Sequence, residues 1–78
     1  MALSDTDATF LEQMIEHHQA ALDMSRDYLQ APTAERGAVV TLLAQTIIKA
    51  QTAEIAKMRK WLADDDREAT PRPAGMNM

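Results

Sequence analysis

The sequence predicts an all-α fold, an antiparallel hairpin of two long helices. Apolar residues recur three and four positions apart in both halves of the chain, which is the spacing of one helix face. A break at Pro32 separates the halves, because proline cannot continue a helical hydrogen-bond ladder. No segment alternates apolar and polar residues as a half-buried strand does. With 78 residues, the chain forms one small domain at most.

The first helix is expected over about residues 5–30. The Ser-Asp-Thr-Asp segment that precedes and opens it supplies N-cap candidates, and its acidic groups complement the positive end of the helix dipole. The helix should end near Gln30, because Pro32 restricts the residue before it. Two adjacent stripes run along it and include both histidines, so both are expected to lie on the inward-facing side. The stripes are Phe10, Met14, His17, Ala21, Met24 and Tyr28, and beside them Leu11, Ile15, His18, Leu22 and Leu29.

The second helix is expected over about residues 33–64. Thr33 or the preceding Ala-Pro pair can begin it, which places Gly37 in its second turn as a weak point that costs about 1 kcal/mol. Its inner stripe is apolar except for Gln51 and Glu54. The stripe reads Val40, Ala44, Ile47, Gln51, Glu54, Met58 and Trp61, flanked by Ile48, Ile55 and Leu62.

The apolar face of each helix is wider than one neighbouring helix can cover. Self-association of the hairpin domain, residues 5–64, into a four-helix bundle is the simplest way to bury the rest, so a homodimer or higher homo-oligomer is expected. Residues 65–78 are charged, contain Pro71 and Pro73 and have no apolar periodicity. They are expected to form a flexible tail.

Composition excludes several classes of function. The net charge is -4 and the eight Lys and Arg are scattered, so no basic stripe is available for nucleic acid or an anionic membrane. The longest apolar run is broken by polar residues and is too short to span a bilayer. The chain has no cysteine, which excludes thiol catalysis and leaves methionine and histidine as the ligands for a soft metal. Its first residues lack the basic and apolar regions of an export signal.

The chemistry is concentrated in the stretch MIEHHQAALDM, residues 14–24. Met14 is a helical neighbour of both His17 and His18, and the two histidines point about 100° apart. Met24 lies about 10 Å along the axis from His17, too far to share a mononuclear site with it directly. Imidazole and thioether groups favour copper(I), whereas magnesium or calcium would require several carboxylates and carbonyls.

The predicted second helix carries a matching set, because Gln51, Glu54 and Met58 lie on one face. A turn centred near residue 32 makes the numbers of facing residues sum to about 64, which sets Met14 opposite residues 49–51. Gln51 can then reach Met14 in the same chain. Glu54 and Met58 lie nearer the open end, so they can complete a site on Met14 only by an axial offset or from a second protomer.

The pattern DATFLEQMIEHHQAALDMS and, after a turn, IIKAQTAEIAKMRKWL resembles the bacterial domain-of-unknown-function family three hundred and five. The family's hallmarks are Met-Ile-x-His-His and Gln-x-x-Glu-Ile-x-x-Met-x-x-Trp-Leu, and the match runs from Asp7 to Leu62. The resemblance implies a ferritin-like bundle, export to the periplasm or the exterior, and copper tolerance through Met and His. Glu16 replaces a familiar proline, which leaves the helix unkinked, and the cytoplasm stays an alternative location because no export signal is present. Carried over by position, the implicated residues are Met14, His17, His18, Met24, Gln51, Glu54 and Met58.

Three hypotheses about function follow from these residues. The leading one is a non-catalytic module that binds copper(I) or silver(I) for metal tolerance or buffering, with Gln51 supporting the ligands. A second is a structural self-association module in which buried His, Gln and Glu bond one another and Met fills gaps. A third is a ferritin-like di-metal oxidase, although Met14 stands where such sites carry a Glu. The predicted metal ligands are Met14, His17, His18, Met24, Glu54 and Met58.

Overall fold

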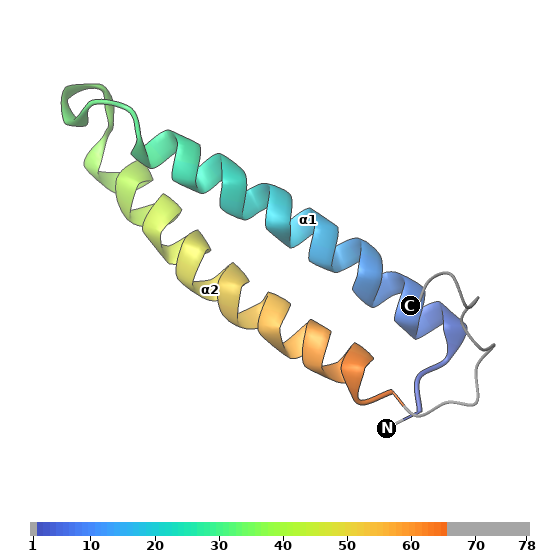
Figure 1. Ribbon diagram of the computed structural model, residues 1–78. Coiled ribbons are helices and arrows are strands. Elements are labelled where there is room, and N and C mark those ends of the chain that lie inside the picture. Colours follow the sequence, from blue (N-terminus) through green and yellow to red (C-terminus); the bar gives the residue numbers. More distant parts are fainter. Residues whose placement is uncertain (1, 66–78) are drawn as a thin grey trace.

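The computed structural model describes residues 2–65, which form two long antiparallel helices joined by a short turn (Figure 1). Helix α1 spans Asp5–Leu29 and helix α2 spans Ala38–Ala63, with one 3-10 turn, η1, over Thr33–Glu35 between them. The two helices pack against each other along their length, and this part of the chain contains no strand. The predicted all-α hairpin is therefore confirmed. Neither helix is long and apolar enough to cross a membrane.

Helix α1 begins where the sequence predicts. Ser4 has an extended backbone, with φ -73° and ψ 162°, and its Oγ accepts a hydrogen bond of 3.0 Å from the Asp7 backbone N–H. This cap satisfies one of the donors that a helix start leaves unpaired. The helix runs without interruption through Glu16 and ends at Leu29, one residue before the predicted end.

Helix α2 begins five residues later than predicted. The expected start at Thr33 instead forms the 3-10 turn η1, after which Arg36 and Gly37 are extended. Gly37, with φ -73° and ψ 149°, is the N-cap of α2 and not a weak point inside it. The low helix propensity of glycine makes this position a favourable place for the chain to leave one helical segment and enter the next.

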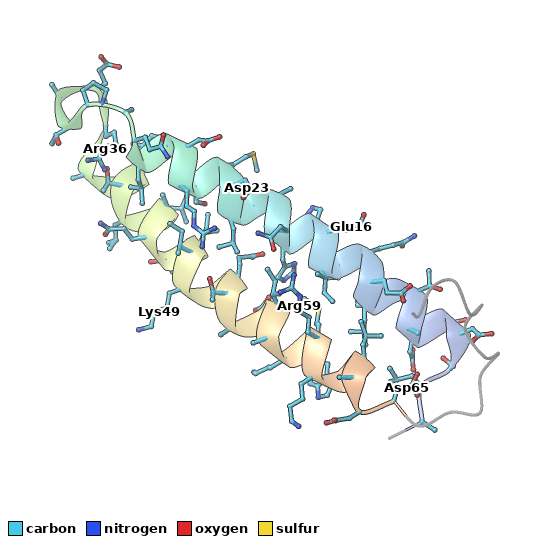
Figure 2. The ribbon with its side chains drawn as sticks, in the orientation of Figure 1. Glu16, Asp23, Arg36, Lys49, Arg59 and Asp65 are labelled. Carbon is cyan, nitrogen blue, oxygen red and sulfur yellow. The ribbon has the colours of Figure 1, made fainter. Side chains whose placement is uncertain are left out.

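The Arg36 side chain holds the turn together. Its guanidinium donates to the Ala31 carbonyl at 3.1 Å and to the hydroxyls of Thr33 and Thr41 at 3.4 and 3.5 Å. Figure 2 shows Arg36 at the turn end of the hairpin. These bonds connect the end of α1, the 3-10 turn and the first turn of α2, so they stabilise the extended segment that delays the second helix.

The register of the hairpin differs from the prediction. His18 meets Glu54, whose numbers sum to 72, and the Leu3 backbone N–H donates to Asp65 at 2.9 Å, a pair whose numbers sum to 68. The predicted sum was about 64. The difference arises because the connection continues to Gly37, which moves the centre of the turn toward the C-terminus.

The hydrophobic core is thin. Its central cluster consists of Leu11, Leu22, Ile55 and Met58, and no side chain in residues 2–65 is completely buried. Large apolar side chains remain exposed on both helices, as two packed helices alone cannot enclose two wide apolar faces. They are Phe10, Met24, Val39, Val40, Leu42, Leu43 and Trp61. The predicted flexible tail lies, from residue 66 onward, outside the described residues.

Candidate metal site

A polar contact between side chains links the two helices. The Nε2 atom of His18 lies 2.5 Å from Oε1 of Glu54. His18 is buried, with 9% of its surface exposed, whereas the Glu54 side chain is 53% exposed. A carboxylate can only accept hydrogen bonds, so Nε2–H donates and Glu54 fixes both the tautomer and the orientation of the ring.

The second ring nitrogen of His18, Nδ1, has a different environment. It is buried and has no hydrogen-bond partner among the described residues. With the proton on Nε2, Nδ1 carries a lone pair, and a buried acceptor without a partner costs about 1–3 kcal/mol. An imidazole that donates one N–H to a carboxylate and leaves the other nitrogen bare has the arrangement that metal-binding histidines use.

Thioether groups from both helices line the groove beside His18. The groove has a volume of about 320 Å³ and holds Met14 from α1 and Met58 from α2. Met58 is buried and Met14 is half-buried. The groove therefore combines two soft sulfur ligands with one imidazole and one carboxylate, a donor set suited to copper(I). Its lining is Phe10, Leu11, Met14, His18, Glu54, Lys57, Met58 and Trp61.

Four of the six predicted ligands thus lie together within one chain. They are Met14, His18, Glu54 and Met58. Of the two ways in which Glu54 and Met58 were expected to reach Met14, the structure shows the axial offset, because the observed register brings the three residues to one groove without a second protomer. One turn before Glu54, Gln51 is half-buried, and its Oε1 is buried without a partner in the described part of the chain.

The other two predicted ligands lie elsewhere. His17 is exposed, so the expectation that both histidines face the interior of the hairpin is wrong for a single chain. Its ring centroid lies 6.3 Å from that of His18, at an angle of 61°. Met24 is 68% exposed and lines a different groove, together with Tyr28 and Leu43. This second groove lies nearer the turn and is here termed the turn groove. The 100° step between successive residues explains why one histidine is buried and the next is not.

Sequence reasoning missed four side chains of the groove beside His18, here termed the site groove. Phe10, Leu11 and Trp61 were assigned only to apolar stripes, and Lys57 was not assigned to the site, yet all four line the groove. Phe10 and Leu11 lie four and three positions from Met14, and Lys57 and Trp61 lie three positions from Glu54 and Met58. This helical spacing was the signal that could have placed them there.

Within residues 2–65, no three His, Cys, Asp or Glu side chains are grouped closely enough to hold a metal ion. A hard ion such as iron(II) or magnesium requires such a group of oxygen and nitrogen donors. Methionine is not one of these four residue types, so a groove that contains thioether sulfur remains compatible with a soft ion.

The fold and the groove define a helical hairpin with a histidine and methionine site between its two helices. The profile of one family, described as Domain of unknown function (DUF305), matches residues 1–77. The chain belongs to this family. Comparison with curated proteins and with solved structures found no match.

Proposed function

We propose that this protein is a non-catalytic module that binds copper(I), or silver(I), for metal tolerance or buffering. One observation carries the proposal: His18, whose buried Nδ1 has no partner among residues 2–65, lines a groove together with Met14 and Met58. Satisfied core histidines normally have partners for both nitrogens. A soft ion would satisfy this nitrogen and use the adjacent sulfur atoms.

Each side chain has a distinct part in this proposal. His18 supplies the imidazole nitrogen, and Met14 and Met58 supply thioether sulfur. Glu54 holds the imidazole through Nε2, which leaves Nδ1 as the nitrogen that can bind a metal. Copper(I), when bound, supplies a soft centre that prefers these ligands to carboxylates alone. Phe10 and Trp61 form apolar walls that limit water at the groove.

We also propose that the hairpin self-associates into a four-helix bundle. Each helix carries a second row of residues at heptad spacing, beside the row that packs inside the chain, and these two rows are here termed the outer seams. Both outer seams border the same side of the hairpin, because all of their residues except His17 and Ala50 line the site groove or the turn groove. The outer seam of α1 is Phe10, Met14, His17, Ala21, Met24 and Tyr28, and that of α2 is Val40, Leu43, Ile47, Ala50, Glu54, Lys57 and Trp61.

A hairpin of this size needs such an assembly for stability. Its core lacks any completely buried side chain in the described residues, and a single small core rarely supplies more than about 3–5 kcal/mol. Sedimentation at micromolar concentration is expected to give a dimer or a larger species. A folded, monodisperse monomer would contradict the assembly.

The metal proposal is tested by anaerobic titration of the purified protein with copper(I) against a competing chelator, repeated with iron(II) and zinc(II). Uptake of copper(I) in preference to the other two ions is expected. If no ion is taken up, the histidines and methionines are structural and the chain is a self-association module. Tight iron(II) binding with consumption of dioxygen would instead support the ferritin-like oxidase.

A further inference from the structure

The site groove has room for a further ligand. Met14 and Met58 bring two thioethers to it, and His18, whose buried Nδ1 has no partner among residues 2–65, also lines it. The groove lies on the surface of a hairpin of two helices, with a volume of about 320 Å³, and no third element of residues 2–65 covers it. A soft ion accepts additional sulfur ligands, so a further thioether that reached this groove could bind there.

The groove lies close to the point at which the chain leaves the hairpin. Helix α2 ends at Ala63, and Trp61, in its last turn, lines the groove. Met58 lies five residues before Ala63, which is about 8 Å along the helix axis. This end of α2 lies beside the start of α1 (Figure 1), where the Leu3 backbone N–H donates to Asp65. The segment that follows residue 65 therefore begins near the soft ligands.

That segment, residues 66–78, lies outside the described residues and contains two more methionines. Met76 and Met78 stand 11 and 13 positions after Asp65. All charged side chains of the segment precede Pro73, so residues 73–78 contain both thioethers and no charged side chain. Burying a charged group without a partner is costly. Residues 73–78 can therefore enter a largely apolar groove without this penalty.

The segment is long enough to return to the groove. An extended chain spans at most about 3.3–3.6 Å per residue, so the 11 positions from Asp65 to Met76 reach roughly 36–40 Å. This reach is several times the axial distance back to Met58. A ligand tethered by a short linker has an effective concentration on the order of millimolar, well above that of a second copy at micromolar protein concentration. The tether therefore favours the segment of the same chain as the occupant of the groove.

The exposed wall of the groove is suited to methionine. Phe10 is 57% exposed and Trp61 is 43% exposed, and both line the groove. Methionine sulfur makes favourable contacts with aromatic rings, and its unbranched side chain adapts to irregular apolar surfaces. A methionine that enters the groove can thus cover aromatic surface that the hairpin leaves in contact with solvent.

We infer that, with a soft ion bound, residues 73–78 fold back over the site groove of their own chain and that Met76 or Met78 supplies a further thioether to the ion. This inference rests on the copper(I) or silver(I) binding proposed above. Either methionine can serve, because only two positions separate them. The segment then closes the open side of the groove, and an apolar cover of this kind limits the access of solvent to a bound metal.

The contact is measured by NMR on the full chain, with the methyl carbons of methionine labelled and assigned through single Met→Leu variants. Silver(I), added to one equivalent, is expected to shift the methyl signals of Met14 and Met58. At least one of Met76 and Met78 should shift with them, whereas Met24, in the turn groove, should not. Shifts confined to the two groove methionines would overturn the inference and leave the proposed metal binding intact. If no methionine signal shifts, both fall.

The affinity gives a second measurement, by anaerobic chelator competition with copper(I). Met76→Leu and Met78→Leu together keep the apolar volume and are expected to weaken binding by about 10-fold. Each single change should cost less than about 3-fold, because the other sulfur replaces the one removed. Met24→Leu is the matched control and should bind as the parent does. Equal affinities of the parent and the double variant would overturn the inference, whereas a parent that takes up no copper(I) would overturn the proposed function.

Dilution shows which chain supplies the methionine. A ligand from the same chain acts at a fixed effective concentration, so the loss in the double variant should be unchanged when the protein is diluted about 10-fold. A loss that disappears on dilution would mean that the methionines bind in the groove of a second copy, and it would overturn the contact within one chain.

Discussion

The buried imidazole of His18 and the carboxylate of Glu54 lie 2.5 Å apart, although 36 positions separate the two residues in the chain. This one contact fixes the level at which the two helices meet. It also uses one nitrogen of a ring whose other nitrogen, Nδ1, has no partner among residues 2–65, in a residue that lines a groove with two methionines. Structure and proposed metal binding therefore depend on the same pair.

The two histidines should contribute unequally to copper(I) binding. His18→Ala is expected to lower the affinity by about 100-fold or more, because it removes the only imidazole of the groove. Replacing a residue that merely holds a metal ligand in place already lowers metal affinity by about 10–100-fold, and loss of the ligand itself should cost more. His17→Ala should lower it by less than about 10-fold, since that ring lies outside the groove of its own chain. Chelator competition measures both values, and circular dichroism checks that each variant is folded. Equal losses would contradict the assignment of His18.

The affinity should also depend on pH. Protons compete with the metal for the imidazole nitrogen, so copper(I) binding is expected to weaken as the pH is lowered. The His18→Ala variant should show little of this dependence, because the thioether of methionine has no proton to exchange. The same competition assay at several pH values tests the difference. A pH profile unchanged by the substitution would point to a site made of methionine alone.

The methionines of the groove should matter more than the exposed one. Met14→Leu and Met58→Leu keep the apolar volume but remove sulfur, and each is expected to reduce copper(I) affinity by about 10-fold or more while costing less than about 1.5 kcal/mol of stability. Met24→Leu is the matched control, as Met24 lines the turn groove and is largely exposed. Equal affinity in all three variants would show that sulfur does not bind the metal.

Periodicity was sufficient to predict the helices and most of the site residues. The stripes that contain Met14, His18 and Met58 follow directly from residue spacing, because a helix repeats every 3.6 residues. Spacing does not determine how two helices slide past each other, which depends on the length and geometry of the turn. The predicted turn was too short, so Glu54 was expected about two turns away from the level at which it lies.

The exposure of His17 has a similar cause. Adjacent positions on a helix differ by 100°, and both histidines fall on an apolar arc that is wider than one partner helix covers. The sequence alone could not say which half of the arc faces α2. In the structure, the side of the arc that contains His18 packs against α2, and the side that contains His17 lies on the outer seam of α1.

The N-cap role of Gly37 gives a test of the observed turn. Gly37→Ser is expected to stabilise the protein by about 0.5–1 kcal/mol, because a serine side chain can cap α2 as Ser4 caps α1 and because the unfolded chain loses freedom. A Cβ at Gly37 meets no atom within 4 Å, so no clash opposes the change. Gly37→Ala is the control. Chemical denaturation should rank serine above alanine, whereas alanine would rank first if Gly37 lay inside a helix as the sequence predicted.

The last prediction concerns the exposed ion pair at the end of α2. Lys60 Nζ lies 2.8 Å from Asp64 Oδ2, and this hydrogen bond, with the charge of Lys60, lowers the pKa of Asp64 below its ordinary value and raises that of Lys60. A carboxyl with a lowered pKa in the folded state stabilises the fold above its unfolded pKa, and this contribution is lost as the pH falls through the folded pKa. Lys60→Gln should therefore raise the Asp64 pKa, as read by NMR titration of the carboxyl.

The same substitution should lower the thermal midpoint only slightly at neutral pH, because both side chains are exposed to solvent. The difference between the variant and the parent should shrink as the pH falls through the lowered folded-state pKa of Asp64, because the carboxylate is then protonated in both proteins. Lys57→Gln, which removes an equal charge without touching Asp64, is the matched control for a general change in net charge. An Asp64 pKa that rises equally in both variants would mean that the overall charge of the helix end, and not the contact with Lys60, sets its value.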